Sequence, residues 1–150
     1  MTWTDNPEYL RKGMEFEGFT RRLFSDAYFE ILFQSDEKGT KVPDFYIRLR
    51  DNRYKFWVEA KYRDRPVGDK IDIYRDKPDR LVTLRVFQEL MLPETVFLVL
   101  GVGGESSSPN DLYCLPVKEL AYPSPFSRNL EKWRIDSSPF INYENGSLVK

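Results

Sequence analysis

Histidine is absent from the sequence. This absence excludes Ser-His-Asp and Cys-His catalysis, the zinc hydrolases that bind their metal through histidine, and nucleases that use a histidine base. An enzyme built from this chain must work with carboxylates, lysines, hydroxyls and, where it needs a metal ion, one that accepts oxygen ligands.

Cysteine and long apolar runs are scarce as well. Cys114 is the single cysteine, so the chain has neither a disulfide framework nor a cysteine cluster for structural zinc. No apolar run reaches the length of about 20 residues that a membrane span needs. The N-terminal stretch MTWTDNPEYLRKG also lacks the apolar segment of a signal peptide. We therefore expect a cytoplasmic protein without a membrane partner.

The composition is that of a chain able to bury its own core. Of its 150 residues, 41% are hydrophobic and 15% are aromatic, which favours a single domain. The formal net charge is −1, but residues 41–80 hold twelve Lys and Arg against eight Asp and Glu. This segment forms either a local basic surface or a solvated face of mixed charge.

Hydrophobic periodicity predicts an alternation of helices and strands. The expected order is helix, three strands, helix and two strands, at residues 12–24, 28–34, 44–50, 54–61, 78–92, 95–102 and 111–117. The second helix should turn one apolar side to the core, made of Leu81, Leu84, Phe87, Leu90 and Met91. This order predicts an α/β fold in which a mixed central β-sheet is flanked by helices.

The expected domain covers residues 1–150. Its core lies at about 12–118, and a C-terminal extension rich in proline and serine follows at 119–150, with one helical piece near Ser127. Residues 62–77, between the hairpin and the second helix, are polar with weak periodicity and are expected to form a loop.

The stretch VPDFYIRLRDNRYKFWVEAKYR at residues 42–63 predicts a β-hairpin with a defined register. Its two apolar faces have to lie on the same side of the sheet. A two-residue turn at Asp51-Asn52 meets this condition and pairs Phe45 with Val58. The same register places Asp44 opposite Glu59, on the other face.

Two carboxylates facing each other across a strand pair repel, so a fold without a use for Asp44 and Glu59 would be destabilised by them. A divalent cation relieves the conflict, and oxygen ligands of this kind suit Mg²⁺. Lys61 lies two residues beyond Glu59 on the same face, where its ammonium can orient a metal-bound water or stabilise developing negative charge. A solvent-facing edge with a weak ion pair is the alternative interpretation.

These residues resemble the signature of the PD-(D/E)xK phosphodiesterase superfamily, the restriction-endonuclease-like nucleases. The matching residues are Pro43-Asp44 and Glu59-Ala60-Lys61, and the upstream GMEFE at 13–17 fits the Gly-x-x-Phe-Glu context of the family. The resemblance implies an α-β-β-β-α-β core over residues 12 to about 102.

The resemblance also implies roles for individual residues. Asp44, Glu59 and the Ala60 carbonyl would bind Mg²⁺, for which Mn²⁺ would substitute, and Lys61 would act on the attacking water. Glu17 would assist at a second or water-mediated metal contact, with Glu15 a weaker substitute. The expected product carries a 5′-phosphate.

Further candidates lie near this signature. Arg63, Arg65 and Lys70 follow Lys61 and are candidate phosphate contacts, or else belong to a solvated loop. Gln88 resembles a glutamine that some family members place near the active site, although a surface position on the helix explains it equally well.

The sequence thus predicts a hydrolase, a Mg²⁺-dependent endonuclease that binds and cuts nucleic acid, with DNA favoured over RNA. Because 150 residues leave no room for a separate DNA-reading domain, a homodimer or a partner protein would supply substrate choice. The rival hypothesis is a catalytically silent module of the same fold that binds nucleic acid or a protein.

Overall fold

The fold was analysed in a computed structural model, which describes residues 7–35, 42–51, 54–74, 77–135, 142–144 and 147–149. Its helices are α1 (Pro7–Leu23) and α2 (Pro78–Met91), with short 3-10 helices η2 (Val117–Glu119) and η3 (Ser127–Trp133). Its strands are β1 (Phe29–Gln34), β2 (Phe45–Leu49), β3 (Lys55–Arg63), β4 (Val96–Glu105), β5 (Ser108–Pro116), β6 (Arg134–Ile135), β7 (Asn142–Glu144) and β8 (Ser147–Val149). Within these ranges no helix is both long and apolar enough to cross a membrane.

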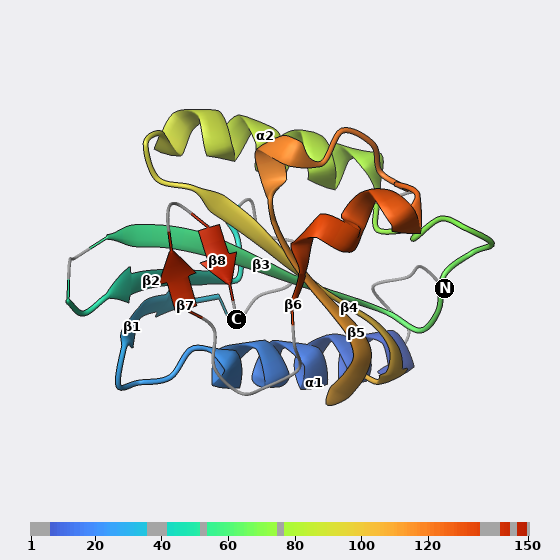
Figure 1. The fold of residues 1–150 in the computed structure, drawn as a ribbon, viewed down its shortest axis with the longest axis horizontal. Helices are drawn as coiled ribbons and strands as arrows, with labels where there is room; N and C mark the ends of the chain where they lie inside the picture. Colours follow the sequence, from blue (N-terminus) through green and yellow to red (C-terminus); the bar gives the residue numbers. More distant parts are fainter. Residues whose placement is uncertain are drawn as a thin grey trace.

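Strands β1 to β6 form one mixed sheet in the order of the sequence. Every neighbouring pair is antiparallel except β3 and β4, which are parallel and are joined through α2. Figure 1 shows α1 along one side of the sheet and α2 along the other, with the orange and red segment that contains η3 on the side of α2. The predicted α/β fold with helices on both sides of a mixed sheet is confirmed.

Each face of the sheet has its own hydrophobic core. Phe16 and Leu23 of α1 pack on one face together with Phe24, which follows the helix, whereas Leu81 and Leu84 of α2 pack on the other. Strand β4 separates the two cores and is buried from its first residue to the seventh, as its continuous apolar run predicts.

One contact between the layers depends on a glycine. A Cβ placed on Gly101 in β4 would lie 2.5 Å from the Cε1 atom of Phe16, which is buried in the core beneath α1. The absence of a side chain at Gly101 therefore allows the Phe16 ring to lie directly against the sheet.

The hairpin has the predicted register. Phe45 pairs with Val58, and the Leu49 N–H donates to the Tyr54 carbonyl at 2.8 Å, which closes the ladder at the expected position. Asn52, the second residue of the predicted turn, lies outside the described residues.

The second helix departs from the sequence prediction in the side that it buries. Leu81, Leu84 and Gln88 face the sheet, whereas the side chain of Leu90 is 72% exposed. Positions 81, 84 and 88 follow the i, i+3, i+7 spacing of a single helix stripe, and Leu90 falls outside that stripe. The polar residue Gln88 therefore occupies a core position, whereas the sequence analysis had placed Leu90 on the buried side of the helix.

The loop after β3 is held by the C-terminal extension. The Pro125 carbonyl accepts from the Ile71 N–H at 2.9 Å, and the Pro123 carbonyl accepts from the N–H groups of Ile73 and Tyr74 at 3.1 and 2.9 Å. Ile71, Ile73 and Tyr74 are buried. Residues 71–74 of the weakly periodic segment are thus packed against the C-terminal extension, whereas residues 64–70 are exposed.

Candidate active site

Asp44 lies immediately before β2 and joins it to β3 through its side chain. Its Oδ2 atom accepts a hydrogen bond from the Ala60 N–H at 2.8 Å, while its backbone carbonyl accepts from the Ser35 N–H at 2.8 Å. The carboxylate thus takes the place of a carbonyl at the end of the β2–β3 ladder. Because the N–H and C=O groups of one strand residue face the same neighbour, the Ala60 carbonyl faces this side as well.

Glu59 is the buried member of the carboxylate pair. It is 3% exposed and lies on the face of β3 that α2 covers. Burial, followed by the negative charge of Asp44, raises the pKa of Glu59 from 4.5 to about 7. The repulsion expected from the sequence is therefore present, and Glu59 changes its charge near neutral pH.

Arg80, at the start of α2, is the cation that faces Glu59. Its Nη2 atom lies 3.0 Å from both carboxylate oxygens, and its Nε atom lies 3.1 Å from Oε2. The same Nη2 also donates to the Val42 carbonyl at 3.3 Å. Arg80 opposes the rise in the pKa of Glu59 and fixes the orientation of its carboxylate.

Lys61 extends from β3 toward the same charges and is half-buried. Burial, partly offset by the charge of Glu59, lowers the pKa of its ammonium. Its Nζ atom lies 5.5 Å from the centre of the Tyr74 ring, a cation–π arrangement. A lysine with a lowered pKa can hold a water molecule and exchange a proton with it more readily than an exposed lysine.

The oxygen atoms of this site fit a small divalent cation. Two carboxylates and one backbone carbonyl are ligands of the type that Mg²⁺ takes, together with water. A carboxylate offers about four acceptor positions. The three contacts from Arg80 leave one acceptor position of the Glu59 carboxylate open. Among the described residues no group of three or more acidic, histidine or cysteine side chains is placed to hold a metal ion, so any metal here would rely on the carbonyl and on water.

Glu17 approaches from a different layer. It is half-buried on α1, which packs on the sheet face opposite to that of Glu59 and Lys61. Its assistance at a metal stays a prediction.

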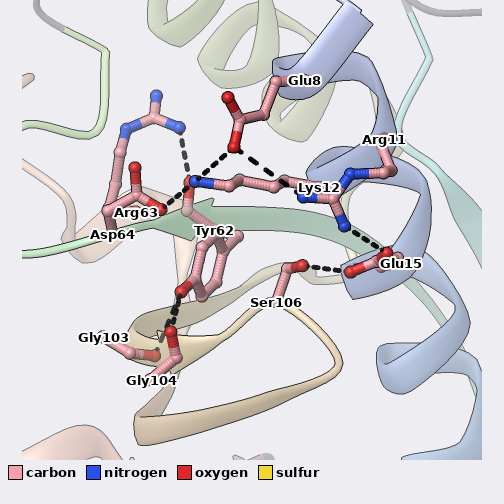
Figure 2. A network of polar contacts seen from close by, with 10 residues as sticks. All are labelled: Glu8, Arg11, Lys12, Glu15, Tyr62, Arg63, Asp64, Gly103, Gly104 and Ser106. Atoms are coloured by element: carbon pink, nitrogen blue, oxygen red, sulfur yellow. Dashed lines mark hydrogen bonds and ion pairs between the residues drawn. The ribbon is translucent and has the colours of Figure 1, made fainter.

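Glu15 takes part in a polar network at the N-terminal half of α1 (Figure 2). The Ser106 hydroxyl donates to Glu15 at 2.5 Å, and Lys12 pairs with Asp64 at 2.7 Å. The Tyr62 hydroxyl donates to the carbonyls of Gly103 and Gly104 near the end of β4. This network attaches α1 to the end of β3, and it binds the carboxylate of Glu15 to the β4–β5 turn.

The three candidate phosphate contacts differ in what they touch. The Arg63 guanidinium donates to the carbonyls of Tyr62, Asp72 and Ile73, so it holds the loop after β3. Arg65 and Lys70 are exposed.

Lys70 borders a hollow of about 730 Å³ beside that loop. Tyr122, Pro123 and Phe126 line the same hollow, and the Lys70 Nζ atom lies 5.0 Å from the centre of the Phe126 ring. Of the described residues that line it, none is Asp44, Glu59 or Lys61.

Gln88 is buried under the sheet rather than on the surface. Its amide donates to the Glu94 carbonyl and accepts from the Val96 N–H, both at 2.7 Å. These two bonds fix the turn between α2 and β4.

Tyr46 and Trp57, which share the face of Glu59, stack on each other with ring centres 4.2 Å apart, and both donate to the Glu94 carboxylate. Trp57 also packs against Phe87 of α2. The two aromatic rings therefore pack beneath the second helix.

Two residues of the site, Arg80 and Tyr74, were missed in the sequence analysis. Arg80 was counted there only as part of a basic segment, and Tyr74 lies in the loop whose weak periodicity gave no signal. In the sequence, Tyr74 follows the isoleucines at 71 and 73, and Arg80 lies in the first turn of the predicted helix; neither position by itself specifies any chemistry.

The order of strands and helices defines a restriction-endonuclease-like core, α-β-β-β-α-β. A solved structure with this arrangement is that of Hjc, a Holliday junction resolvase from the archaeal hyperthermophile Archaeoglobus fulgidus. The two structures match with a TM-score of 0.51 and 18% sequence identity, over 83% of this chain and 91% of that chain. The likeness confirms the predicted restriction-endonuclease-like fold of the chain.

No protein-family model matches the sequence, and the search of curated proteins returns no match.

Proposed function

We propose that this chain is a metal-dependent nuclease that hydrolyses phosphodiester bonds in DNA. The observation that carries the proposal is the convergence of Asp44, Glu59 and Lys61 at one end of the β2–β3 hairpin, where burial and the charge of Asp44 raise the pKa of Glu59 beside the half-buried Lys61. Ionisable groups with shifted pKa values in close contact are typical of catalytic sites. The fold shared with a Holliday junction resolvase supports DNA as the substrate.

In this proposal Asp44, Glu59 and the Ala60 carbonyl hold Mg²⁺ or Mn²⁺. When bound, such an ion supplies an acidic water and positive charge near the scissile phosphate. Lys61 orients the attacking water and offers a proton to the charge that develops, and cleavage leaves a 5′-phosphate. Arg80 keeps the Glu59 carboxylate aligned through its three contacts to the two carboxylate oxygens.

Substrate binding requires positive charge outside the metal site. Arg65 and Lys70 are exposed and remain the proposed phosphate contacts. Glu17 remains the proposed auxiliary acid. A second copy of the chain or a partner protein would add selectivity for a branched or duplex substrate. A DNA substrate also agrees with the cytoplasmic location expected from the sequence.

A second function is supported by one observation. Arg80 contacts both carboxylate oxygens of Glu59, as a cation would in a site that needs no metal. The chain would then be a nuclease-fold module that binds nucleic acid or a protein without cutting.

The deciding experiment measures cleavage of four-way-junction, duplex and single-stranded DNA, and of RNA, with Mg²⁺ or Mn²⁺. Asp44→Asn and Lys61→Met should each abolish cleavage, because one removes a metal ligand and the other the ammonium. Asp51→Asn and Lys55→Met are matched controls at exposed positions of the same hairpin and should cleave at the wild-type rate.

A second readout is thermal stability. Mn²⁺ should raise the melting temperature of the wild type and of both controls but not that of Asp44→Asn, because a ligand that binds only the folded state stabilises it. Absence of cleavage on every substrate, together with a melting temperature that Mn²⁺ leaves unchanged, would establish the binding module instead.

A further inference from the structure

The hydroxyl group of Tyr74 is buried beside the candidate site and has no hydrogen-bond partner among the residues that the structure describes. The whole side chain is only 2% exposed. A buried hydroxyl without a partner is unfavourable for folding, and phenylalanine would fill the same space without that cost. A ligand bound at the adjacent site would supply the acceptor that the described residues do not.

The surroundings of Tyr74 are those of the site itself. Lys61 places its Nζ atom 5.5 Å from the centre of the ring. Burial, and then the charge of Glu59, raise the pKa of the Tyr74 hydroxyl well above its ordinary value, so the group stays protonated. It is thus a hydrogen-bond donor next to a cation, and both favour an acceptor that carries negative charge.

The position of Tyr74 is fixed on both sides. Its N–H donates to the Pro123 carbonyl at 2.9 Å, and its carbonyl accepts from the Lys77 N–H at 3.1 Å. The preceding residue, Ile73, is held by the Arg63 guanidinium. A donor held in this way needs little reorganisation to bind a ligand, which is the property of groups that stabilise charge in enzymes.

The anion that such a site meets in a nuclease is the phosphodiester. Phosphate contacts on nucleic acids come from tyrosine hydroxyls as well as from arginine and lysine. We propose that the Tyr74 hydroxyl is a further catalytic residue, donating to a non-bridging oxygen of the scissile phosphate beside Lys61. This assignment rests on the proposed function.

The test uses Tyr74→Phe, with Tyr113→Phe as its matched control. Tyr113 is also buried on the α2 side of the sheet, but its hydroxyl accepts from Arg134, which pairs with Asp111 and Glu131 rather than with Asp44 or Glu59. Tyr74→Phe should melt at or above the wild-type temperature, because it loses no internal hydrogen bond. It should cleave junction DNA at least about tenfold more slowly with Mn²⁺ and bind it more weakly with Ca²⁺. Tyr113→Phe should cleave and bind like the wild type.

Each result separates this assignment from the proposed function. If the wild type cuts DNA and Tyr74→Phe cuts it equally fast, the Tyr74 assignment is wrong and the nuclease remains. If the wild type does not cut but binds DNA with Ca²⁺, the nuclease proposal fails, and weaker binding by Tyr74→Phe alone still supports a phosphate contact. Equal binding by the two proteins, or no binding by the wild type, overturns the assignment.

Discussion

The Nη2 atom of Arg80 lies 3.0 Å from each carboxylate oxygen of Glu59, and this pair joins the start of α2 to the centre of the sheet. The side chain of Glu59 is 3% exposed and that of Arg80 is 15% exposed. Because Glu59 is buried and is also a proposed metal ligand, we expect this ion pair to influence both the stability of the fold and the binding of a metal.

Removing the arginine should leave an unpaired buried carboxylate. We expect Arg80→Met to lower the free energy of unfolding by about 3–5 kcal/mol at pH 8 without metal, the usual effect of breaking a buried pair. The loss should be smaller at pH 5, where Glu59 can take up a proton. Urea unfolding at both pH values measures the difference.

The matched control for this prediction is Arg85→Met on the same helix. Arg85 donates to the Leu120 carbonyl and does not face the carboxylates, so its replacement should cost only about 1 kcal/mol at either pH. A loss at Arg80 as small as that at Arg85 would contradict the structural role of the pair.

The raised pKa of Glu59 predicts a particular dependence of stability on pH. Its pKa is about 7 in the folded chain and 4.5 as a free group, so between these values the folded state binds more protons than the unfolded state. Without metal, stability should therefore fall as the pH rises from about 4.5 through 7. Mn²⁺ should offset this fall above pH 7, because it binds the charged carboxylate.

The pH prediction is tested by comparing the wild type with Glu59→Gln. The melting temperature of Glu59→Gln minus that of the wild type should rise from pH 5 to pH 8 in EDTA, because only the wild type loses stability as Glu59 ionises. A constant difference would mean that Glu59 keeps its ordinary pKa in the folded chain.

Gln88 should contribute to stability rather than to catalysis. Because both ends of its amide bond to the backbone of the turn before β4, Gln88→Leu should lower the free energy of unfolding by about 1–3 kcal/mol. Its cleavage rate, measured well below the melting temperature, should equal that of the wild type. The exposed neighbour Glu89 provides the control, since Glu89→Leu breaks neither bond. A large loss of cleavage in a stable Gln88→Leu protein would restore the active-site hypothesis.

Two glycines should respond in opposite directions to the same change. Gly101→Ala places a methyl group 2.5 Å from the buried Phe16 ring and should destabilise the fold by about 1–3 kcal/mol. In Gly18→Ala the new Cβ lies 3.5 Å from the nearest atom, Nη1 of Arg22, an ordinary contact within α1. That change should stabilise the helix by about 0.5–1 kcal/mol. Chemical denaturation of the two variants measures both changes in the free energy of unfolding. A change of the same sign in both would contradict the close contact between Gly101 and Phe16.

The sequence predicts the hairpin well because two independent constraints agree there. Alternating apolar residues set the register, and the same register brings Asp44 to the end of the strand that carries Glu59. Local patterns of this kind are sufficient for neighbouring strands.

The remainder of the site depends on tertiary packing that local patterns do not encode. Arg80 meets Glu59 across 21 residues, through a loop and the start of a helix. Tyr74 is ordered by carbonyls of the extension, and Gln88 occupies a core position that polarity argues against. Each of these positions follows from the final packing of α2 and of residues 117–135 on the sheet.

The hydrogen bonds that the N–H groups of Ile73 and Tyr74 donate to the Pro123 carbonyl have a consequence for how the protein matures during synthesis. A nascent chain that has left the ribosome only as far as β5 already contains Asp44, Glu59 and Lys61. It lacks the carbonyl that seats Tyr74, because that carbonyl belongs to a later part of the chain. In the proposed nuclease, the Tyr74 hydroxyl would therefore reach its final position only when residues 117–135 dock, which makes this the last step in assembling the site.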